Sequence, residues 1–317
     1  REIRGLHEAA YLLGIFALLS QLLALVRDRI LAHSFGAGEI LDIYYAAFRI
    51  PDLVFVSIAS LVSVYVLIPF LTEKLSKSKE EMRIFVSTIF SFFFSTIVLV
   101  SIIVFYFTPE LVALFFPGMK DSVLYNDLIL MTRILLLQPI LLGISNLFAS
   151  ITQTYQRFVL YAISPLLYNV GIIIGVLFIY PTLGIKGLVW GVVLGAFLHM
   201  LVQVPFIMKE GLLPKITFPR WGAVKDVVFL SIPRTIALAA HQIVLLVLVA
   251  FASLLAPGSI SVLNFSFNLQ AVPLTIIGVS YSVAAFPTLA RLFSNGQKNE
   301  FFDHVVIALR HIIFWSL

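Results

Sequence analysis

Residues 27 to 51, RDRILAHSFGAGEILDIYYAAFRIP, are the most informative stretch of this sequence. The stretch places three arginines and two aspartates between two apolar runs that are each long enough to cross a membrane. A charged side chain at membrane depth is costly, so it normally faces a bundle interior or a watery cavity and marks a path for substrate or ions. The stretch therefore predicts a helical membrane protein with a polar site inside it.

The composition agrees with this class of protein. Of the 317 residues, 61% are hydrophobic and 12% are charged, and the mean hydropathy is +1.06. Soluble domains are about half apolar and about a quarter charged. The absence of cysteine excludes thiolate catalysis and zinc-thiolate sites within this sequence. His33, His199 and His241 lack ligand-like spacing, so no metal site is expected.

Apolar runs of about 20 residues, the length that a bilayer requires, recur along the chain. Eight such runs are predicted to be membrane spans, at residues 9–26, 53–72, 84–108, 134–152, 158–180, 187–208, 235–256 and 260–290. A ninth begins at Phe301 and is still apolar at Leu317. Because the sequence also opens with Arg1, we expect it to be a fragment of a longer chain.

The distribution of the 21 lysines and arginines predicts the orientation, since these residues collect in cytoplasmic loops. With the N-terminus inside, thirteen fall in inner segments, four in outer loops, among them Arg27 and Arg29, and four at or within spans. We therefore predict a cytoplasmic N-terminus. The formal charge of +5 does not indicate nucleic acid as a partner, because that would require a basic face on a soluble module.

The chain also contains a loose internal repeat. Residues 35–70 and residues 254–289 each combine a glycine turn, an aromatic half-helix, a proline, a half-helix rich in serine and valine, and a second proline. The two copies are six spans apart and are predicted to run in the same direction, which is a known plan of transporters built from two six-helix bundles. This repeat favours an alternating-access carrier.

Prolines and glycines within the spans carry two further predictions. Prolines are predicted to interrupt helices in four spans, at Pro51, Pro165, Pro233 and Pro273. Glycines spaced four residues apart in spans five and six are predicted to let these two helices pack closely, at Gly171, Gly175, Gly191 and Gly195.

Several motifs carry a family resemblance that covers most of the chain. LVRDRILAHSFGAG, LDIYYAAFRIPDL and VLIPFLTEKL near the start, and ISPLLYNVGIIIGV, ASLLAPGSISVLNFSF and FPTLARLF later, resemble the MurJ/MviN-type lipid II flippases of the multidrug/oligosaccharidyl-lipid/polysaccharide exporter superfamily. The resemblance implies an all-α transporter fold and an inner-membrane carrier that exports the undecaprenyl-pyrophosphate-linked peptidoglycan precursor. Members usually have fourteen spans, so residues 1–210 would form the first six-span bundle and residues 211–317 the start of the second.

The resemblance also implies site residues. Arg27 and Asp28 match the family's Arg-Asp pair at the end of span one, Asp42 matches the acid that opens span two, and Arg49 matches a basic position before the proline. Other family positions differ here. Gln21 and Phe55 stand where the family has cavity arginines, Ser60 where it has a glutamate, and Phe267 and Asn268 where it has an Asp-Arg pair in span eight.

The arginines suit an anionic head group, because a guanidinium offers a planar fork of donors that fits phosphate oxygens in pairs. Arg27, Arg29, Arg49 and Arg234 are the candidates, with Asp28 and Asp42 beside them. Each also has a structural alternative. Arg27 and Asp28 could be an ion pair at a helix end, Arg49 could be offset by Asp42, and Arg234, which follows Pro233 at the predicted start of span seven, could reach the inner interface.

We therefore expect a non-enzymatic flippase that exports lipid II and acts as a monomer among membrane lipids. We expect it to hold no cofactor, and a coupling cation, if one is used, is not identified by the sequence. Two alternatives keep the same membrane architecture: an exporter of polysaccharide units or drugs from the same superfamily, and a non-transporting scaffold for envelope proteins. A membrane-embedded transferase would need paired carboxylates or an acidic metal-binding motif in a loop, and the short loops of this chain contain neither.

Overall fold

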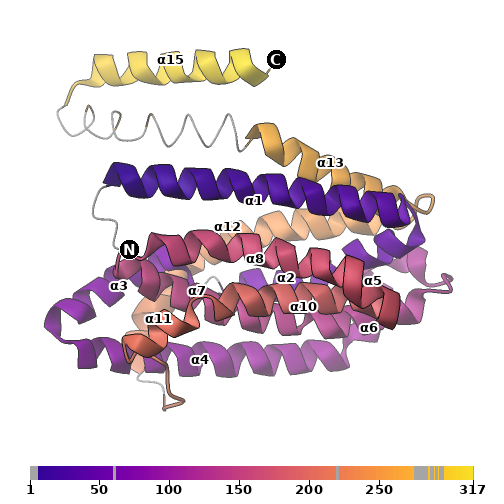
Figure 1. The fold of residues 1–317 in the computed structure, drawn as a ribbon, viewed down its shortest axis with the longest axis horizontal. Coiled ribbons are helices and arrows are strands. Elements are labelled where there is room, and N and C mark those ends of the chain that lie inside the picture. The colour runs from indigo at the N-terminus through magenta and orange to yellow at the C-terminus, as the bar shows by residue number, and fades with distance from the viewer. Residues whose placement is uncertain are drawn as a thin grey trace.

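The computed structural model describes residues 6–59, 62–218, 221–274 and 296–316, together with residues 285, 289 and 292. The described residues form helices joined by short connections, and most of the helices run roughly along one axis (Figure 1). Such an arrangement satisfies the backbone hydrogen bonds within each segment, as a membrane requires. We use the name first lobe for the helices of the predicted first bundle, which are α1 (Leu6–Phe35), α2 (Glu39–Ala59), α3 (Val64–Lys77), α4 (Lys79–Tyr106), α5 (Thr108–Phe115), α6 (Tyr125–Leu135), α7 (Leu137–Thr154), α8 (Phe158–Ile174), α9 (Tyr180–Leu183), α10 (Ile185–Leu201) and α11 (Val204–Lys209).

Six of the eight predicted spans fall on helical segments that are long and apolar enough to cross a membrane, among the described residues. These segments are Glu39–Lys77, Lys79–Tyr106, Tyr125–Thr154, Phe158–Leu183, Ile185–Lys209 and Val224–Ala252. The first predicted span lies within α1, and the first half of the eighth is α13 (Ser259–Pro273). Most of the second half of the eighth lies outside the described residues, as do Ser60, Arg291 and most of FPTLARLF.

The helices extend further than the apolar runs that predicted them. α1 continues to Phe35, so the placement of Arg27 and Arg29 in an outer loop was wrong. α12 (Trp221–Ala252) begins well before residue 235, so Arg234 lies thirteen residues inside the helix and not at its start. In both cases the backbone stays helical where the side chains turn polar, because an unpaired backbone group at membrane depth costs several kcal/mol.

Three of the four prolines lie inside continuous helices. α2 continues through Pro51, α8 through Pro165 and α12 through Pro233, so the predicted interruption was wrong at these three positions. Pro273 is the last residue of α13. Membrane helices tolerate proline because neighbouring groups satisfy the backbone atoms that it leaves free.

Helix α8 and the π-helical turn Gly175–Ile179 that continues it touch α10 backbone to backbone along the predicted glycines, which confirms that prediction. A Cβ atom added to Gly171 would lie 2.2 Å from Cα of Gly195, and one added to Gly175 would lie 2.5 Å from Cα of Gly191. Small residues at a helix interface allow this approach in membranes, where packing contributes most of the association energy. The glycine pairs therefore set how closely α8 and α10 pack against each other in the first lobe.

We expect Gly191→Leu to lower the thermal stability of the purified protein strongly, because neither backbone can move away from the new side chain. Overpacking of this kind costs about 1–3 kcal/mol for added methylene groups, and more where backbone atoms form the obstacle. Gly14→Leu is the matched control, since a Cβ at Gly14 meets no described atom within 4 Å. Equal melting temperatures for the two variants would contradict this packing.

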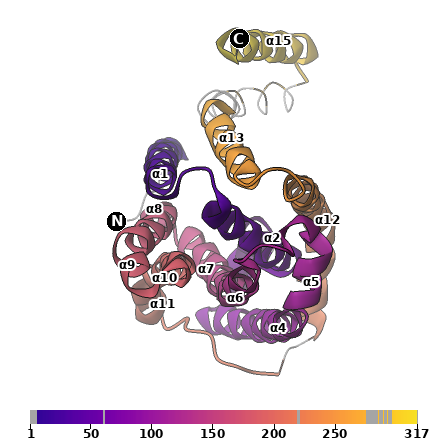
Figure 2. The same ribbon diagram turned by 90° about the vertical axis from the view of Figure 1, so that its right-hand side faces the viewer.

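We use the name second lobe for the described residues from 211 onward, the start of the predicted second bundle, and its first segment, residues 211–218, is held against α4. Ser87 Oγ accepts from the backbone N–H of Lys215 at 3.2 Å, and Ser91 Oγ accepts from that of Thr217 at 2.8 Å. α12 then packs along α2, and α13 follows between α1 and α12, while α15 (Lys298–Ser316) lies apart (Figure 2). We call the end of the molecule that holds Ser78, Arg157 and Lys209 the inner end, and the opposite end, where Asp42 contacts Gly258, the outer end.

A glycine with positive φ precedes the first helix of each predicted repeat copy. Gly36 has φ +65° just before α2, and Gly258 has φ +98° just before α13, and both values belong to the left-handed region that favours glycine. The two helices run in the same direction, because Asp42 contacts Gly258 and Arg49, further along α2, contacts Asn264, further along α13. The later part of the second copy lies outside the described residues.

Candidate functional site

Arg27 and Asp28 form an ion pair in the second half of α1, within the bundle. Nη2 of Arg27 lies 2.7 Å from Oδ1 of Asp28 and Nε lies 2.9 Å from the same oxygen. The Arg27 side chain is 18% exposed and that of Asp28 is 9% exposed. A pair so far removed from water is stable only when further hydrogen bonds satisfy its remaining donors and acceptors.

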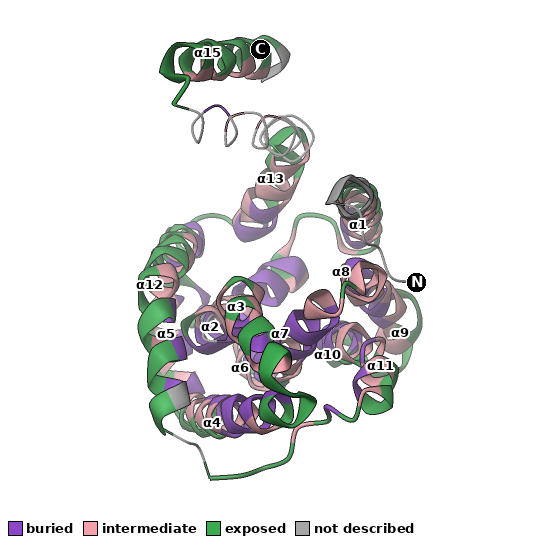
Figure 3. Ribbon diagram, turned by 90° about the vertical axis from the view of Figure 1, so that its left-hand side faces the viewer, coloured by how far each residue is buried: buried purple, intermediate pink, exposed green. Residues whose placement is uncertain are grey.

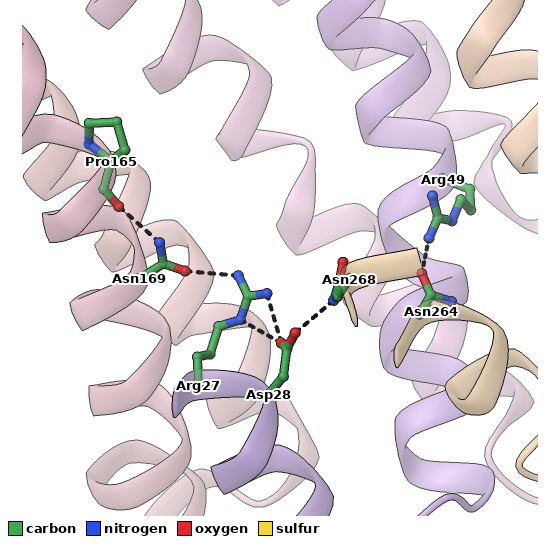
Figure 4. Close-up of polar contacts among 7 residues, drawn as sticks. All are labelled: Arg27, Asp28, Arg49, Pro165, Asn169, Asn264 and Asn268. Carbon is green, nitrogen blue, oxygen red and sulfur yellow. Dashed lines mark hydrogen bonds and ion pairs between the residues drawn. The ribbon is translucent and has the colours of Figure 1, made fainter. Parts of the chain in front are cut away.

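Asparagines on two other helices supply those hydrogen bonds (Figure 4). Nη1 of Arg27 donates to Oδ1 of Asn169 on α8 at 2.9 Å, and Nδ2 of Asn169 donates to the carbonyl of Pro165 at 3.1 Å. Nδ2 of Asn268 on α13 donates to Oδ2 of Asp28 at 2.8 Å. The ion pair therefore joins α1 and α8 of the first lobe to α13 of the second.

Arg49 on α2 makes a separate contact with the second lobe. Its Nη2 donates to Oδ1 of Asn264, which is buried and whose Nδ2 donates to the carbonyl of Ile260 at 2.8 Å. Asp52, three residues further along α2, attracts the same guanidinium. Nε of Arg49 is buried and has no hydrogen-bond partner among the described atoms. A buried donor without a protein partner is uncommon, and it is free to donate to a ligand.

Aromatic side chains surround these charges. The ring of Tyr45 packs edge-on against Phe265 of α13 with centroids 5.7 Å apart, and against Tyr44 with centroids 5.2 Å apart. The Tyr45 hydroxyl is buried and has no hydrogen-bond partner among the described atoms. Tyr168 on α8 accepts a hydrogen bond from Nε2 of Gln138 at 3.2 Å. Polar and aromatic groups therefore line the boundary between the two lobes at membrane depth.

Asp42 has a different environment from the arginines. Its Oδ2 accepts from the backbone N–H of Gly258 at 2.5 Å, and its Oδ1 accepts from the backbone N–H and the hydroxyl of Ser261 at 2.8 and 2.6 Å. It therefore caps the N-terminus of α13 from another helix, as a carboxylate does favourably at that end. Its predicted contact with substrate stays a prediction, and Arg49 is not its partner.

The remaining candidates lie away from the ion pair. Arg29 is exposed on α1. Arg234 is half-buried on α12, and its guanidinium stacks on the ring of Tyr65, 4.3 Å from the centroid. The structure thus brings Arg27, Asp28 and Arg49 to the boundary between the lobes, and separates them from Arg29 and Arg234.

Sequence reasoning missed the role of the asparagines. Asn169 was not singled out, Asn264 was not considered, and Asn268 was noted only as a departure from the family pattern. A signal was present, because Asn264 and Asn268 are four residues apart on one face of a largely apolar helix. An intramembrane amide needs a hydrogen-bond partner, so two on one face indicate a polar neighbour.

Comparison with known proteins identifies the family. The family model described as lipid II flippase MurJ matches residues 31–317. This chain belongs to the MurJ family. A probable lipid II flippase MurJ of Buchnera aphidicola (subsp. Acyrthosiphon pisum) is 30% identical over 296 residues, which are 91% of this chain and 57% of that protein. The lipid II flippase MurJ of Burkholderia cenocepacia is 27% identical over 295 residues, 90% of this chain and 57% of that protein.

A solved structure confirms the fold. The structure described as lipid II flippase MurJ, inward closed conformation, matches with a TM-score of 0.79 and 26% identity, over 96% of this chain and 63% of that one. The predicted all-α transporter fold and the resemblance to the MurJ family are therefore confirmed. The chain spans little more than half the length of the curated MurJ relatives that it matches.

Proposed function

We propose that this chain is part of a flippase that carries lipid II, a polyprenyl-pyrophosphate-linked peptidoglycan precursor, across the bacterial inner membrane. Its membership of the MurJ family supports this activity. The observation that carries the proposal is the Arg27–Asp28 pair, which lies at membrane depth and is bonded to helices of both lobes. Charged groups in such a place mark a substrate pathway by default.

The geometry suits transport by alternating access. The pyrophosphate of the head group would exchange its hydration for the guanidinium groups of Arg27 and Arg49, which bind phosphate oxygens in pairs. The polyprenyl tail would remain in lipid, because moving it into a polar cavity would cost about 0.8 kcal/mol for each CH₂ group.

The contacts between the lobes can also be broken without large cost. Arg49 and Asp28 each reach the second lobe through a neutral asparagine, and not through an opposite charge. A hydrogen bond that involves one charged group contributes about 1.5–3 kcal/mol, which a bound head group can replace. The two asparagines would therefore hold the lobes together in the absence of substrate and release them when phosphate takes their place.

Several finer features belong to this proposal. The N-terminus is cytoplasmic, the protein acts as a monomer, and the site performs no catalysis and holds no resident cofactor. The membrane potential could return the unloaded carrier through a coupled cation, at about 2.3 kcal/mol per charge per 100 mV.

A second candidate function rests on the family positions that differ in this sequence. Gln21 and Phe55 stand where the resemblance places cavity arginines, and Asn268 replaces a charged residue. Fewer cations favour a head group with less negative charge than a pyrophosphate bearing a peptide. An exporter of another polyprenyl-linked sugar would meet this condition with the same fold.

Complementation distinguishes the two functions. We expect the full-length gene to restore growth to cells depleted of their lipid II flippase, and Arg49→Ala to reduce lipid II export about 10- to 100-fold, which corresponds to the loss of one charge-assisted bond. Arg133→Ala is the control, because Arg133 packs on Phe105 outside the site. Failure of a well-expressed, membrane-inserted wild-type protein to rescue growth would reject lipid II as the substrate.

A further inference from the structure

Arg234 is a third arginine at membrane depth, and it belongs to the second lobe. It lies thirteen residues from the first residue of α12, Trp221, which is about 20 Å along the helix. The charged residues of α12 that precede it, Lys225 and Asp226, are nine and eight residues away, which is about 12 to 14 Å along the helix. Arg234 is half-buried, and its Nε is buried without a hydrogen-bond partner among the described atoms.

The neighbour of Arg234 is an aromatic ring and not an acid. Its guanidinium lies 4.3 Å from the ring centroid of Tyr65, in the first turn of α3, and no carboxylate among the described residues forms an ion pair with it. Stacking uses the face of the guanidinium and leaves its N–H groups, which point outward in the plane, available to a ligand. Tyr65 therefore holds the cation in place without neutralising its charge.

The pair joins the two lobes, because Tyr65 belongs to α3 and Arg234 to α12. Tyr65 is 73% exposed, and Tyr161 on α8 is within electrostatic reach of it. Figure 3, which views the molecule from the inner end, shows α3 between α12 on one side and α8 on the other. Arg234 thus contacts α3 from the second lobe, whereas Arg27 and Arg49 belong to the first lobe.

The depth of Arg234 differs from that of Arg49. The outer ends of α2 and α12 are at similar levels, because Asp42 of α2 contacts Gly258 just beyond α12. Arg49 is ten residues, or about 15 Å, from the outer end of α2, and Arg234 is eighteen residues, or about 27 Å, from the outer end of α12. Arg234 is therefore about 12 Å closer to the inner side.

We propose that Arg234, stacked on Tyr65, is a second and inner binding site for the pyrophosphate of the substrate, occupied before the site at Arg27 and Arg49. This inference rests on the proposed function and adds to it a binding step on the inner side. A substrate that enters from the inner side meets Arg234 first, and its N–H groups can pair with phosphate oxygens as they do at the deeper arginines. The second lobe thereby supplies a cation from α12, although Asn268 on α13 stands where the family resemblance places a charged residue.

Binding of farnesyl pyrophosphate to the purified full-length protein tests this site. We expect Arg234→Ala to weaken binding about five- to tenfold, Arg234→Lys to restore part of the loss, and Tyr65→Phe, which keeps the ring, to weaken binding less than Tyr65→Ala does. Tyr65→Ala should weaken binding, because the cation loses its support. Arg133→Ala is the matched control, since Arg133 stacks on Phe105 at 4.7 Å in the same manner, away from the site.

The outcomes separate the inference from the proposed function. If Arg234→Ala binds farnesyl pyrophosphate like the wild type while Arg27→Ala binds it weakly, the inner site is rejected and the function stands. If the wild type binds neither farnesyl pyrophosphate nor lipid II, both are rejected. Melting temperatures of the variants decide whether a loss of binding reflects misfolding, and equal losses for Arg234→Ala and Arg133→Ala at equal stability would also overturn the inner site.

Discussion

Replacing Asp28 with alanine is expected to cause the largest loss of stability of any single change at the site. The substitution leaves the Arg27 guanidinium inside the bundle without a counter-charge and removes the acceptor of Asn268. Breaking a buried pair in this way costs about 3–5 kcal/mol, since an uncompensated charge remains. Thermal unfolding of the purified protein measures the effect, with Asp121→Ala in an exposed loop as the control.

A second variant tests whether the charge is the cause. Arg27→Gln combined with Asp28→Asn removes both charges while retaining amides that can hydrogen-bond to Asn169 and Asn268. We expect this double variant to recover most of the stability lost in Asp28→Ala, because replacing both members of a buried pair is often neutral. Lipid II export should nevertheless stay low, since the guanidinium is gone. A double variant as unstable as Asp28→Ala would show that the ion pair is not the source of the effect.

The parts of the structure that depend on local pattern could be predicted from the sequence. Runs of apolar residues located most of the membrane helices, and glycines at a spacing of four located the contact between α8 and α10. The ends of the helices could not be predicted in this way. The hydrogen-bonded backbone of a helix continues past the last apolar residue of the run that predicted it. Arg27 and Arg234 therefore lie deeper in their helices than their polar neighbours suggested.

The partners of the charged residues could not be predicted from a single sequence. Asp42 and Gly258 are 216 residues apart, and Arg49 and Asn264 are 215 apart. Asp42 and Arg49 were adjacent candidates on one helix face, yet each bonds to its own residue on α13. The repeat predicted that α2 and α13 are related, but it could not show that they touch, because contact depends on how the two lobes close.

The contact between Asp42 and α13 predicts how the outer end of the protein is held shut. Three hydrogen bonds reach this carboxylate from Gly258 and Ser261, which lie in the second lobe. The turn is also tightly seated, because a Cβ added to Gly258 would lie 2.6 Å from the carbonyl oxygen of Ala37. Asp42 therefore holds the lobes together where the outer end of the substrate path would open.

We expect Asp42→Ala to shift the protein toward an outward-open state and to lower its stability by about 2–4 kcal/mol, since the N–H groups of Gly258 and Ser261 lose a charged acceptor. Asp42→Asn should cause part of this loss, because its amide oxygen can still accept from Ser261 whereas its amide nitrogen cannot accept from the N–H of Gly258. Ser261→Ala, which keeps both backbone bonds, should cause a smaller change.

Labelling of an introduced thiol measures this opening. A cysteine at Phe265, half-buried beneath the contact, is accessible to a membrane-impermeant maleimide only when the outer end opens, and this sequence has no cysteine of its own to interfere. Asp42→Ala should raise the labelling rate from outside the cell, and Glu39→Ala, which removes an acid from the first turn of the same helix, should not. Unchanged labelling in Asp42→Ala would mean that the outer end is closed by other contacts. Raised labelling together with lost transport would show that closure at Asp42 is a required step of the cycle.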